Sequence, residues 1–474
     1  MKRLVKHMCV LMACLAFTGC VPENTNQANK NAVPSPVASA TASPSPAEDN
    51  TAAKTDVLTL PVLDAFFADE SFSGLLKTRL QLTDEQVAKL KDLAHSETGA
   101  LNEEKAGKGA GESSTARSEA TEKIGALIGP EKTRQLAALI GEQWAGASEE
   151  TSDKTAARPK NVPNAVPTDS RIVVNAPAYR MDVFESGRLI KSYKVGIGYP
   201  QFPLPTGLRK AQVIIFNPTW TPPDEPWVAK MKGVNAGEKV AAGSKLNPLG
   251  PIKIPIGGPS LIHGGKSPAK LGTFASHGCV GLTTPQIQDF AKVLAQLGGA
   301  HLTDTELIDY ARDKTETKQV KLERPVPVEL RYETLVVEDG KLHIYRDVYD
   351  QETNTEENLR AVLEANGVRL EDLTETERTQ VLEALAQMSG KQGAGADKPK
   401  DTPSPVASPR SPSASEKKAN AGKKTTAVAK NQKEIVIEIA ALNGKGYPAP
   451  VALDTGSGKT KVALSAPSKR EKQP

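Results

Sequence analysis

The segment Ile262–Leu282 has the sequence IHGGKSPAKLGTFASHGCVGL. It holds Cys279 and two of the six histidines of the chain, His263 and His277. A neighbouring imidazole can take the proton of a thiol and lower its pKa, which produces the thiolate needed for acyl transfer. Glycines close to the cysteine leave room for main-chain N–H groups to approach a substrate carbonyl. A cysteine or histidine taken singly is more often structural, but the combination predicts a cysteine nucleophile with a histidine base.

The N-terminus predicts export. Met1-Lys2-Arg3 is positively charged, and the apolar run Met8–Phe17 is too short to span a bilayer as a permanent helix. The run leads into Thr18-Gly19-Cys20, which resembles the lipobox of bacterial lipoproteins, where the cysteine is lipidated. We therefore expect residues 1–20 to be a lipoprotein signal peptide, Cys20 to be lipidated, and the protein to be anchored to a membrane in the cell envelope or periplasm. An ordinary cleaved signal peptide without an anchor is the alternative.

Processing at that position would leave one thiol. Cys9 and Cys14 would depart with the signal peptide and Cys20 would carry lipid, so that Cys279 alone would remain. No disulfide could then form within the chain. A lone thiol in an exported protein is exposed to mispairing and oxidation, so a reactive role explains it better than a scaffold role.

Composition divides the chain into ordered and disordered parts. With 35 Pro, 37 Gly and 4% aromatic residues, long stretches cannot bury enough apolar surface to offset chain entropy. We expect a disordered tether over 21–57, a linker over 146–167 and a disordered linker over 390–432. The net charge of +4 gives little attraction to nucleic acid, so no nucleic-acid partner is expected.

Two segments have helical spacing, 58–145 and 355–389. Thr83 with Gln86, and Thr374 with Glu377, form capping boxes that open amphipathic helices. Pro130 is expected in the first turn of a further helix. The sequence LTDEQ at 82–86 resembles the LTxxQ motif of small helical periplasmic chaperones, but a packing module is favoured, because amphipathic stripes usually face a core.

Residues 168–350 are rich in strand patterns, and we expect a mostly β domain with short helices. Ser186-Gly187 and Asp339-Gly340 are hairpin turns, and the apolar run Val213–Phe216 predicts a strand covered on both faces. One amphipathic helix is expected from Thr284 to Leu297. The tail, 433–474, contains one strand-like alternation at Glu434–Ile439, which suits an edge or an isolated hairpin.

The segment Ser276-His277-Gly278-Cys279, with His263 upstream, resembles the signature of the YkuD-type L,D-transpeptidases. The likeness extends over roughly 171–349, where further landmarks occur in family order. They are Arg171-Ile172-Val173-Val174-Asn175, Val195-Gly196-Ile197-Gly198, Pro205-Thr206-Gly207, Asn217-Pro218-Thr219-Trp220-Thr221-Pro222-Pro223 and Asn247-Pro248-Leu249-Gly250. The resemblance implies the L,D-transpeptidase-like β-sandwich for 168–350, with helical modules and linkers on either side.

The resemblance also implies the role of each site residue. Cys279 would attack the substrate carbonyl, His263 would be the base, and the carbonyl of Gly264 would orient the imidazole. His277 would lie beside the nucleophile and assist proton transfer. The remaining implied residues shape the site, provide main-chain oxyanion donors around the cysteine, or line the substrate approach; they are Ser276, Gly278 and Trp220. Where many members carry arginine two residues after the cysteine, this chain has Gly281.

The implied reaction has two steps. Cys279 attacks the L,D bond between the third residue of a tetrapeptide stem of peptidoglycan and its terminal D-alanine, which leaves a thioester. An amine then resolves the thioester: a diaminopimelate side chain gives a 3-3 cross-link, and a lysine of a wall-attached lipoprotein gives protein attachment. No metal or organic cofactor is implied.

Several alternatives stay open. Water as the acceptor would make the protein an L,D-carboxypeptidase. A papain-like peptidase is disfavoured because His263 precedes Cys279, and a zinc site is disfavoured because no tight ligand spacing is present. A catalytically inactive wall-binding or chaperone-like lipoprotein is the rival from another class, with Gly281 as its only hint in the sequence.

Overall fold

The computed structural model describes residues 58–100, 112–144, 162–389 except 225, 313 and 315, and 432–456. The expected signal peptide, Cys20 and the whole of the tether lie outside the described residues, as do most of the two expected linkers. In the described part of the chain, no helix is long and apolar enough to cross a membrane.

The N-terminal helices form a module with its own apolar core. They are α1 (Leu60–Phe67), α2 (Glu70–Leu80), α3 (Asp84–Ala100), α4 (Glu112–Ile128) and α5 (Pro130–Trp144). The capping box that opens α3 is confirmed: the Thr83 N–H donates to Gln86 Oε1 at 3.1 Å, and the Gln86 N–H donates to Thr83 Oγ1 at 3.2 Å. Pro130 begins α5, as predicted. Leu76, Leu90 and Leu136 are among the fully buried residues of this core.

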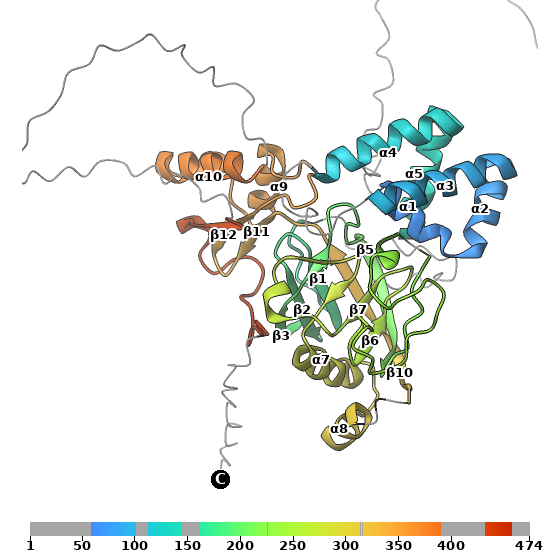
Figure 1. Ribbon diagram of the computed structural model, residues 1–474. Helices are drawn as coiled ribbons and strands as arrows, with labels where there is room; N and C mark the ends of the chain where they lie inside the picture. The colour runs from blue at the N-terminus through green and yellow to red at the C-terminus, as the bar shows by residue number, and fades with distance from the viewer. Residues whose placement is uncertain are drawn as a thin grey trace, which may run out of the picture. The chain divides into compact units, whose positions relative to one another are not determined.

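An eight-stranded sheet forms the centre of the curled, mostly β core (Figure 1). Its strands lie in the order β3-β2-β1-β10-β5-β6-β7-β9. Their bounds are β1 (Arg171–Asn175), β2 (Arg180–Glu185), β3 (Arg188–Lys194), β5 (Gly207–Phe216), β6 (Ile252–Pro255), β7 (Leu261–His263), β9 (Val280–Gly281) and β10 (Lys318–Arg331). A parallel pair, β4 (Ile197–Gly198) and β8 (Phe274–Ser276), forms a second small sheet.

Local sequence explains several of these elements. Ser186 and Gly187 both have positive φ, as the tight turn between β2 and β3 requires. Helix α7 (Thr284–Leu297) begins with a capping box on Thr283 and packs its apolar stripe into the main core (Figure 1). The strand over 213–216 is confirmed, but the prediction that both its faces are covered is wrong. Ile214 and Phe216 are buried, whereas the alternate residues keep partial exposure.

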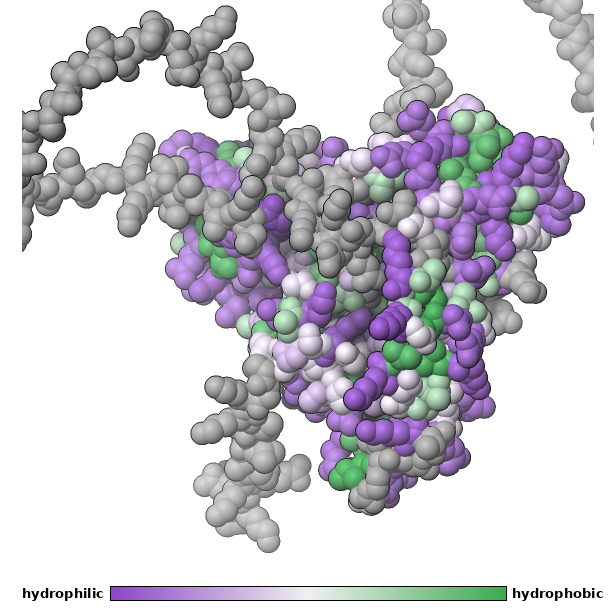
Figure 2. Space-filling model, viewed as in Figure 1, coloured by the Kyte–Doolittle hydropathy of each residue, from purple (hydrophilic) through white to green (hydrophobic). Residues whose placement is uncertain are grey.

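Short helices complete the described elements of this part of the chain. They are α6 (Pro226–Ala229), the 3₁₀ turn η1 (Pro268–Lys270) and α8 (Asp304–Arg312). On the face shown in Figure 2, hydrophilic residues dominate and hydrophobic residues appear only in small areas.

A three-stranded sheet and two helices enclose another apolar core. The strands are β11 (Leu335–Glu338), β12 (Lys341–Tyr345) and β13 (Glu434–Glu438), and the helical elements are α9 (Glu356–Ala365), η2 (Leu370–Asp372), α10 (Glu375–Met388) and η3 (Ala440–Leu442). The Asp339-Gly340 hairpin and the Thr374 capping box are confirmed. β13 pairs with β12 and lies at the sheet edge, as its alternation predicted.

The segment after β13 runs back to the edge of the large sheet. Tyr447 packs against Phe184 of β2, with ring centroids 5.7 Å apart. Further on, the Ser192 N–H donates to the Val451 carbonyl and the Lys194 N–H donates to the Asp454 carbonyl, each at 2.9 Å. Strand β3 is the edge of the eight-stranded sheet, so these bonds cover main-chain groups that would otherwise be open to pairing.

We expect a chain that ends after Gly390 to be less stable than the full chain by at least ~2 kcal/mol, because Ile437, Ile439 and Leu442 leave the core of the three-stranded sheet. Chemical denaturation monitored by circular dichroism measures the difference. A chain that ends after Gly456 is the control and should unfold like the full protein. Equal stability of all three chains would contradict the role given to residues 432–456.

Candidate active site

The pairing of β7 with β9 brings the two predicted site segments together. These strands are parallel, with Ile262 opposite Val280 and His263 opposite Gly281. The Leu282 N–H donates to the His263 carbonyl at 2.8 Å and extends the pairing. Cys279 directly precedes β9, so the pairing brings the segment that carries the thiol next to the strand that carries His263.

A second contact holds β9 from its other side. Gly196 and Gly281 exchange two main-chain hydrogen bonds, both 2.9 Å long. A Cβ at Gly196 would lie only 2.6 Å from the Cβ of Ala275, so a larger residue could not make this approach. The strand that follows the cysteine is therefore fixed by main-chain bonds on both sides.

His263 is buried, with 3% of its surface exposed, and its ring is oriented by main chain. Its Nδ1 lies 2.8 Å from the Gly264 carbonyl oxygen, which can only accept a hydrogen bond. The proton is therefore assigned to Nδ1, which leaves Nε2 to accept a proton. The contact is the one that the resemblance implied for Gly264.

Burial is the main influence on the protonation of His263, whose pKa it lowers to about 3. The positive charge of Lys266 lowers the pKa further, whereas the carbonyls of Gly264 and Leu249 raise it. At neutral pH the ring is therefore neutral and able to act as a base.

Ser276 fixes the turn that carries the cysteine. Its Oγ accepts a hydrogen bond from the Cys279 N–H at 3.0 Å and donates to the Cys279 carbonyl at 2.6 Å. Ser276 is the last residue of β8, and its own carbonyl accepts from the Tyr199 N–H at 2.8 Å. One hydroxyl thus closes the loop from 276 to 279.

The pKa of the Cys279 thiol differs from the expectation. A histidine neighbour was expected to lower the pKa, but burial of the sulfur raises it above its ordinary value. A backbone hydrogen bond from Leu261 and the charge of Lys266 act in the opposite direction and are weaker. The residue as a whole keeps partial exposure. The resting site therefore holds a neutral thiol and a neutral imidazole rather than an ion pair.

His277 lies among three aromatic rings. Trp227 stacks on it with centroids 4.2 Å apart, and the rings of Phe202 and Tyr199 meet it edge-on at 4.7 and 5.4 Å. Burial lowers the pKa of His277 to about 3, and the charge of Lys266 lowers it further. The imidazole is therefore neutral and held by packing.

Trp220 belongs to the same aromatic stack but stands one ring further away. It is 8% exposed, and its ring stacks on Trp227 with centroids 6.0 Å apart. Trp227 thus connects Trp220 to His277.

Gly278 has a backbone conformation that favours glycine and open space on the side where a Cβ would stand. It has φ +86°, and a Cβ at this position would meet no atom within 4 Å. Since the Cys279 N–H is already donated to Ser276, the N–H of Gly278 is the better candidate donor: within the described residues it makes no hydrogen bond. Gly198 lets Phe202 and Gly278 come close to the main chain at residue 198. A Cβ there would lie 2.0 Å from the Phe202 carbonyl oxygen and 3.1 Å from Gly278.

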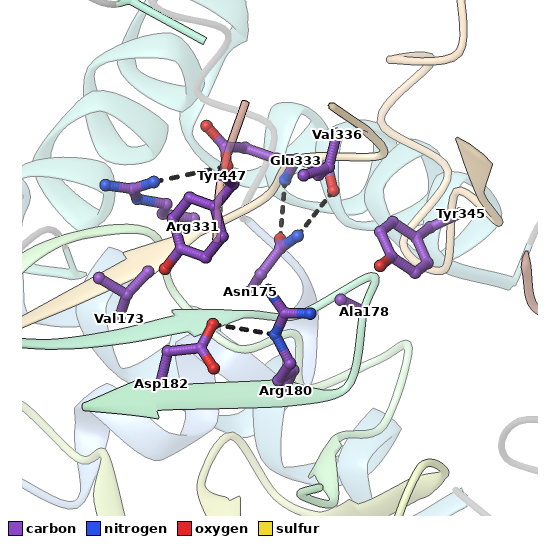
Figure 3. A pocket seen from close by; sticks show the side chains of 10 residues that line it. All are labelled: Val173, Asn175, Ala178, Arg180, Asp182, Arg331, Glu333, Val336, Tyr345 and Tyr447. Carbon is purple, nitrogen blue, oxygen red and sulfur yellow. Dashed lines mark hydrogen bonds and ion pairs between the residues drawn. The ribbon is translucent and has the colours of Figure 1, made fainter. Parts of the chain in front are cut away.

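A pocket elsewhere on the sheet contains none of these residues (Figure 3). In it, Asn175 and Glu333 exchange two hydrogen bonds of 2.9 Å, and Arg180 is paired with Asp182 at 2.9 Å. Arg180 also lies over the Tyr447 ring, with its guanidinium carbon 5.6 Å from the centroid. The pocket is the polar seam at which the C-terminal segment meets β1 and β2. Within the described ranges, no group of three or more His, Cys, Asp or Glu side chains could hold a metal ion.

The structure thus brings together His263, Gly264, Ser276, Gly278 and Cys279, with His277 beside them and Trp220 behind Trp227. Sequence reasoning missed the aromatic neighbours of His277 and the charge of Lys266. The position of Lys266 three residues after His263 could have pointed to that charge, but no local signal marks Tyr199 or Phe202.

Comparison with protein families identifies this segment. Residues 169–322 match the YkuD family, the L,D-transpeptidase catalytic domain. The resemblance seen in the sequence is therefore confirmed, and the YkuD domain occupies the middle of the chain. No curated protein sequence matches the chain.

Solved structures of L,D-transpeptidases are similar to the YkuD domain over about a third of the chain. The catalytic domain of the E. faecium enzyme is 15% identical, with 35% of this chain and 100% of that chain covered and a TM-score of 0.23. The Mycobacterium smegmatis enzyme is 15% identical, with 34% and 58% covered and a TM-score of 0.19. The Mycobacterium tuberculosis H37Rv enzyme is 13% identical, with 34% and 57% covered and a TM-score of 0.20.

We expect the stability of the protein to fall as the pH drops from about 6.5 toward about 3. The unfolded chain takes up protons at His263 and His277 in this range, whereas the native protein keeps both rings neutral, so acid favours unfolding. Thermal unfolding at a series of pH values measures the slope. His263→Gln and His277→Phe should each make it shallower, and His301→Gln, at an exposed position, should leave it unchanged. A slope that none of the variants alters would contradict this account.

Replacing Ser276 by alanine should loosen the turn that carries Cys279. The variant loses both hydrogen bonds to the main chain of Cys279, and we expect a loss of about 1–3 kcal/mol in unfolding free energy. Denaturant titration measures it. Ser276→Thr retains the hydroxyl and is the matched control, so similar losses in both variants would argue against the hydrogen bonds as the cause.

Proposed function

We propose that the YkuD domain is a peptidoglycan L,D-transpeptidase with Cys279 as nucleophile and His263 as base. Support for the proposal comes from the parallel pairing of β7 with β9 inside the segment that matches the family, since this pairing brings the strand of His263 against the strand that follows Cys279.

The chemistry follows from the protonation states. Nε2 of His263 takes the thiol proton as the sulfur attacks the carbonyl of the third stem residue, and the tetrahedral oxyanion accepts a hydrogen bond from the Gly278 N–H. Collapse of this intermediate breaks the L,D bond, and the imidazolium returns its proton to the departing D-alanine amine. An acceptor amine then attacks the thioester and regenerates the thiol, so protons and bonds balance over the two steps.

The product proposed is a cross-link or a protein attachment, depending on the acceptor amine: a second stem or a lysine of a wall-attached lipoprotein. The expected lipid anchor at Cys20 would keep the domain at a membrane within the cell envelope, close to this substrate. His277 would support the nucleophile from its aromatic surroundings, and Trp220 would support the ring that stacks on His277. Neither role needs a metal or an organic cofactor.

Acylation of the full chain by a carbapenem tests the nucleophile. Intact-mass spectrometry should show one adduct on the wild-type protein and none on Cys279→Ala. His263→Gln should form the adduct about 10²- to 10⁴-fold more slowly, because the base is lost. An adduct on Cys279→Ala, or an unchanged rate for His263→Gln, would refute the assigned roles.

Incubation with disaccharide-tetrapeptides tests the reaction itself. Release of D-alanine together with dimeric muropeptides is the expected result. Tripeptide products without any dimer would replace transpeptidation by L,D-carboxypeptidation. If the protein neither turns over the substrate nor forms the carbapenem adduct, the result would favour a wall-binding protein without this activity. Cys279→Ala is the control in each case.

A further inference from the structure

Lys266 acts on every ionisable group of the candidate site. Its positive charge lowers the pKa of His263, of His277 and of Cys279, and among the described residues it is the one charged side chain that does so for all three. A positive charge favours the thiolate and disfavours both imidazolium ions. The direction of all three shifts is thus the one that a positive charge produces.

The main chain holds Lys266 beside the nucleophile strand. The residue follows the Gly264-Gly265 turn, in which Gly265 has φ +80°, and its N–H donates to the Leu282 carbonyl at 3.0 Å. The side chain is partly buried. Its position is thus set by the same pairing of 262–266 with 280–282 that aligns the imidazole and the thiol.

The methylene stem of Lys266 lies directly over Gly281. A Cβ at Gly281 would come within 2.8 Å of Cγ, 2.9 Å of Cε and 3.3 Å of Cδ of Lys266. Any side chain at 281 would therefore displace the lysine. The space that a side chain at 281 would enter is thus filled by the lysine of the loop that follows β7.

We propose that Lys266 supplies the cation of this site: its ammonium stabilises the Cys279 thiolate and binds the free C-terminal carboxylate of the donor stem peptide. The second half rests on the proposed function. In that reaction the departing D-alanine carries its carboxylate one residue beyond the carbonyl under attack, so an ammonium near the sulfur is placed to bind it. In partly buried surroundings such a pair is stronger than on an open surface.

The thiolate half is tested without any substrate. Iodoacetamide alkylation of Cys279 in the full chain, followed by peptide mass mapping across pH, measures the thiol pKa. Lys266→Met keeps the stem and removes the charge, and we expect alkylation at neutral pH to slow roughly threefold to tenfold, a pKa rise of about half to one unit. Lys266→Arg should stay near the wild-type profile. Lys270→Met, in the exposed η1 turn, is the control and should match the wild type.

The substrate half is tested with a tetrapeptide stem and with the same stem carrying a C-terminal carboxamide. Wild-type protein and Lys270→Met should prefer the free acid. Lys266→Met should lose the preference, mainly through a higher KM for the acid, and Lys266→Arg should keep most of it. A preference that survives in Lys266→Met would overturn carboxylate binding, and an unshifted alkylation profile would overturn the thiolate role.

A double variant separates charge from packing. Gly281→Arg alone should impair the site, because the new side chain collides with Lys266. Lys266→Ala combined with Gly281→Arg should recover part of the alkylation rate and of the acid preference, since a guanidinium can then enter the vacated space. Impairment as severe as in Lys266→Ala alone would overturn the proposal. If the wild-type chain turns over no stem peptide, the proposed function fails, and the alkylation profiles still decide whether Lys266 supports the thiolate.

Discussion

The candidate site depends on one short pairing, that of β7 with β9. It consists of two register pairs, extended by main-chain hydrogen bonds from Leu282 to His263 and from Lys266 to Leu282. A slip of one residue would turn the side chains of the shifted strand to its opposite face and change which residue lies opposite His263, because side chains alternate along a strand. The register is protected from such a slip by Ile262 and Val280, both fully buried in the main core. The apolar core therefore fixes the chemistry indirectly, by fixing which face each polar residue takes.

Burial sets the protonation state of the site. It raises the pKa of the Cys279 thiol and lowers the pKa of both histidines, so the two partners are neutral before substrate arrives. An isolated ion pair in this setting would need strong compensation for the loss of hydration. In the proposed reaction the thiol proton moves to His263 only when the sulfur bonds to the substrate carbonyl. The negative charge that then develops can be stabilised by the Gly278 N–H and by Lys266. A site of this kind resists oxidation at rest, because the reactive thiolate is scarce.

Sequence reasoning succeeded where the determinants are local. Capping boxes at Thr83 and Thr374 and the hairpin turn at Ser186-Gly187 follow from a few adjacent residues, and all are confirmed. Sequence reasoning failed for properties that depend on residues far apart in the chain. The raised pKa of Cys279 follows from burial by segments far apart in the chain. The strand pattern at 434–439 indicated β13 but could not name β12 as its partner, and nothing near Tyr447 indicated its contact with Phe184.

The glycines near the site show why the sequence could anticipate its geometry only in part. Gly198 admits the Phe202 carbonyl at a distance where no Cβ could stand, and Gly250, at φ +67°, admits the main chain of Gly265. Gly281 does the same for the stem of Lys266. Each glycine marks a place where another segment must come close, yet a sequence does not say which segment arrives. Gly281 illustrates the consequence: the absence of a side chain there leaves room for a lysine from the loop after β7, which the residues next to Gly281 in the sequence do not indicate.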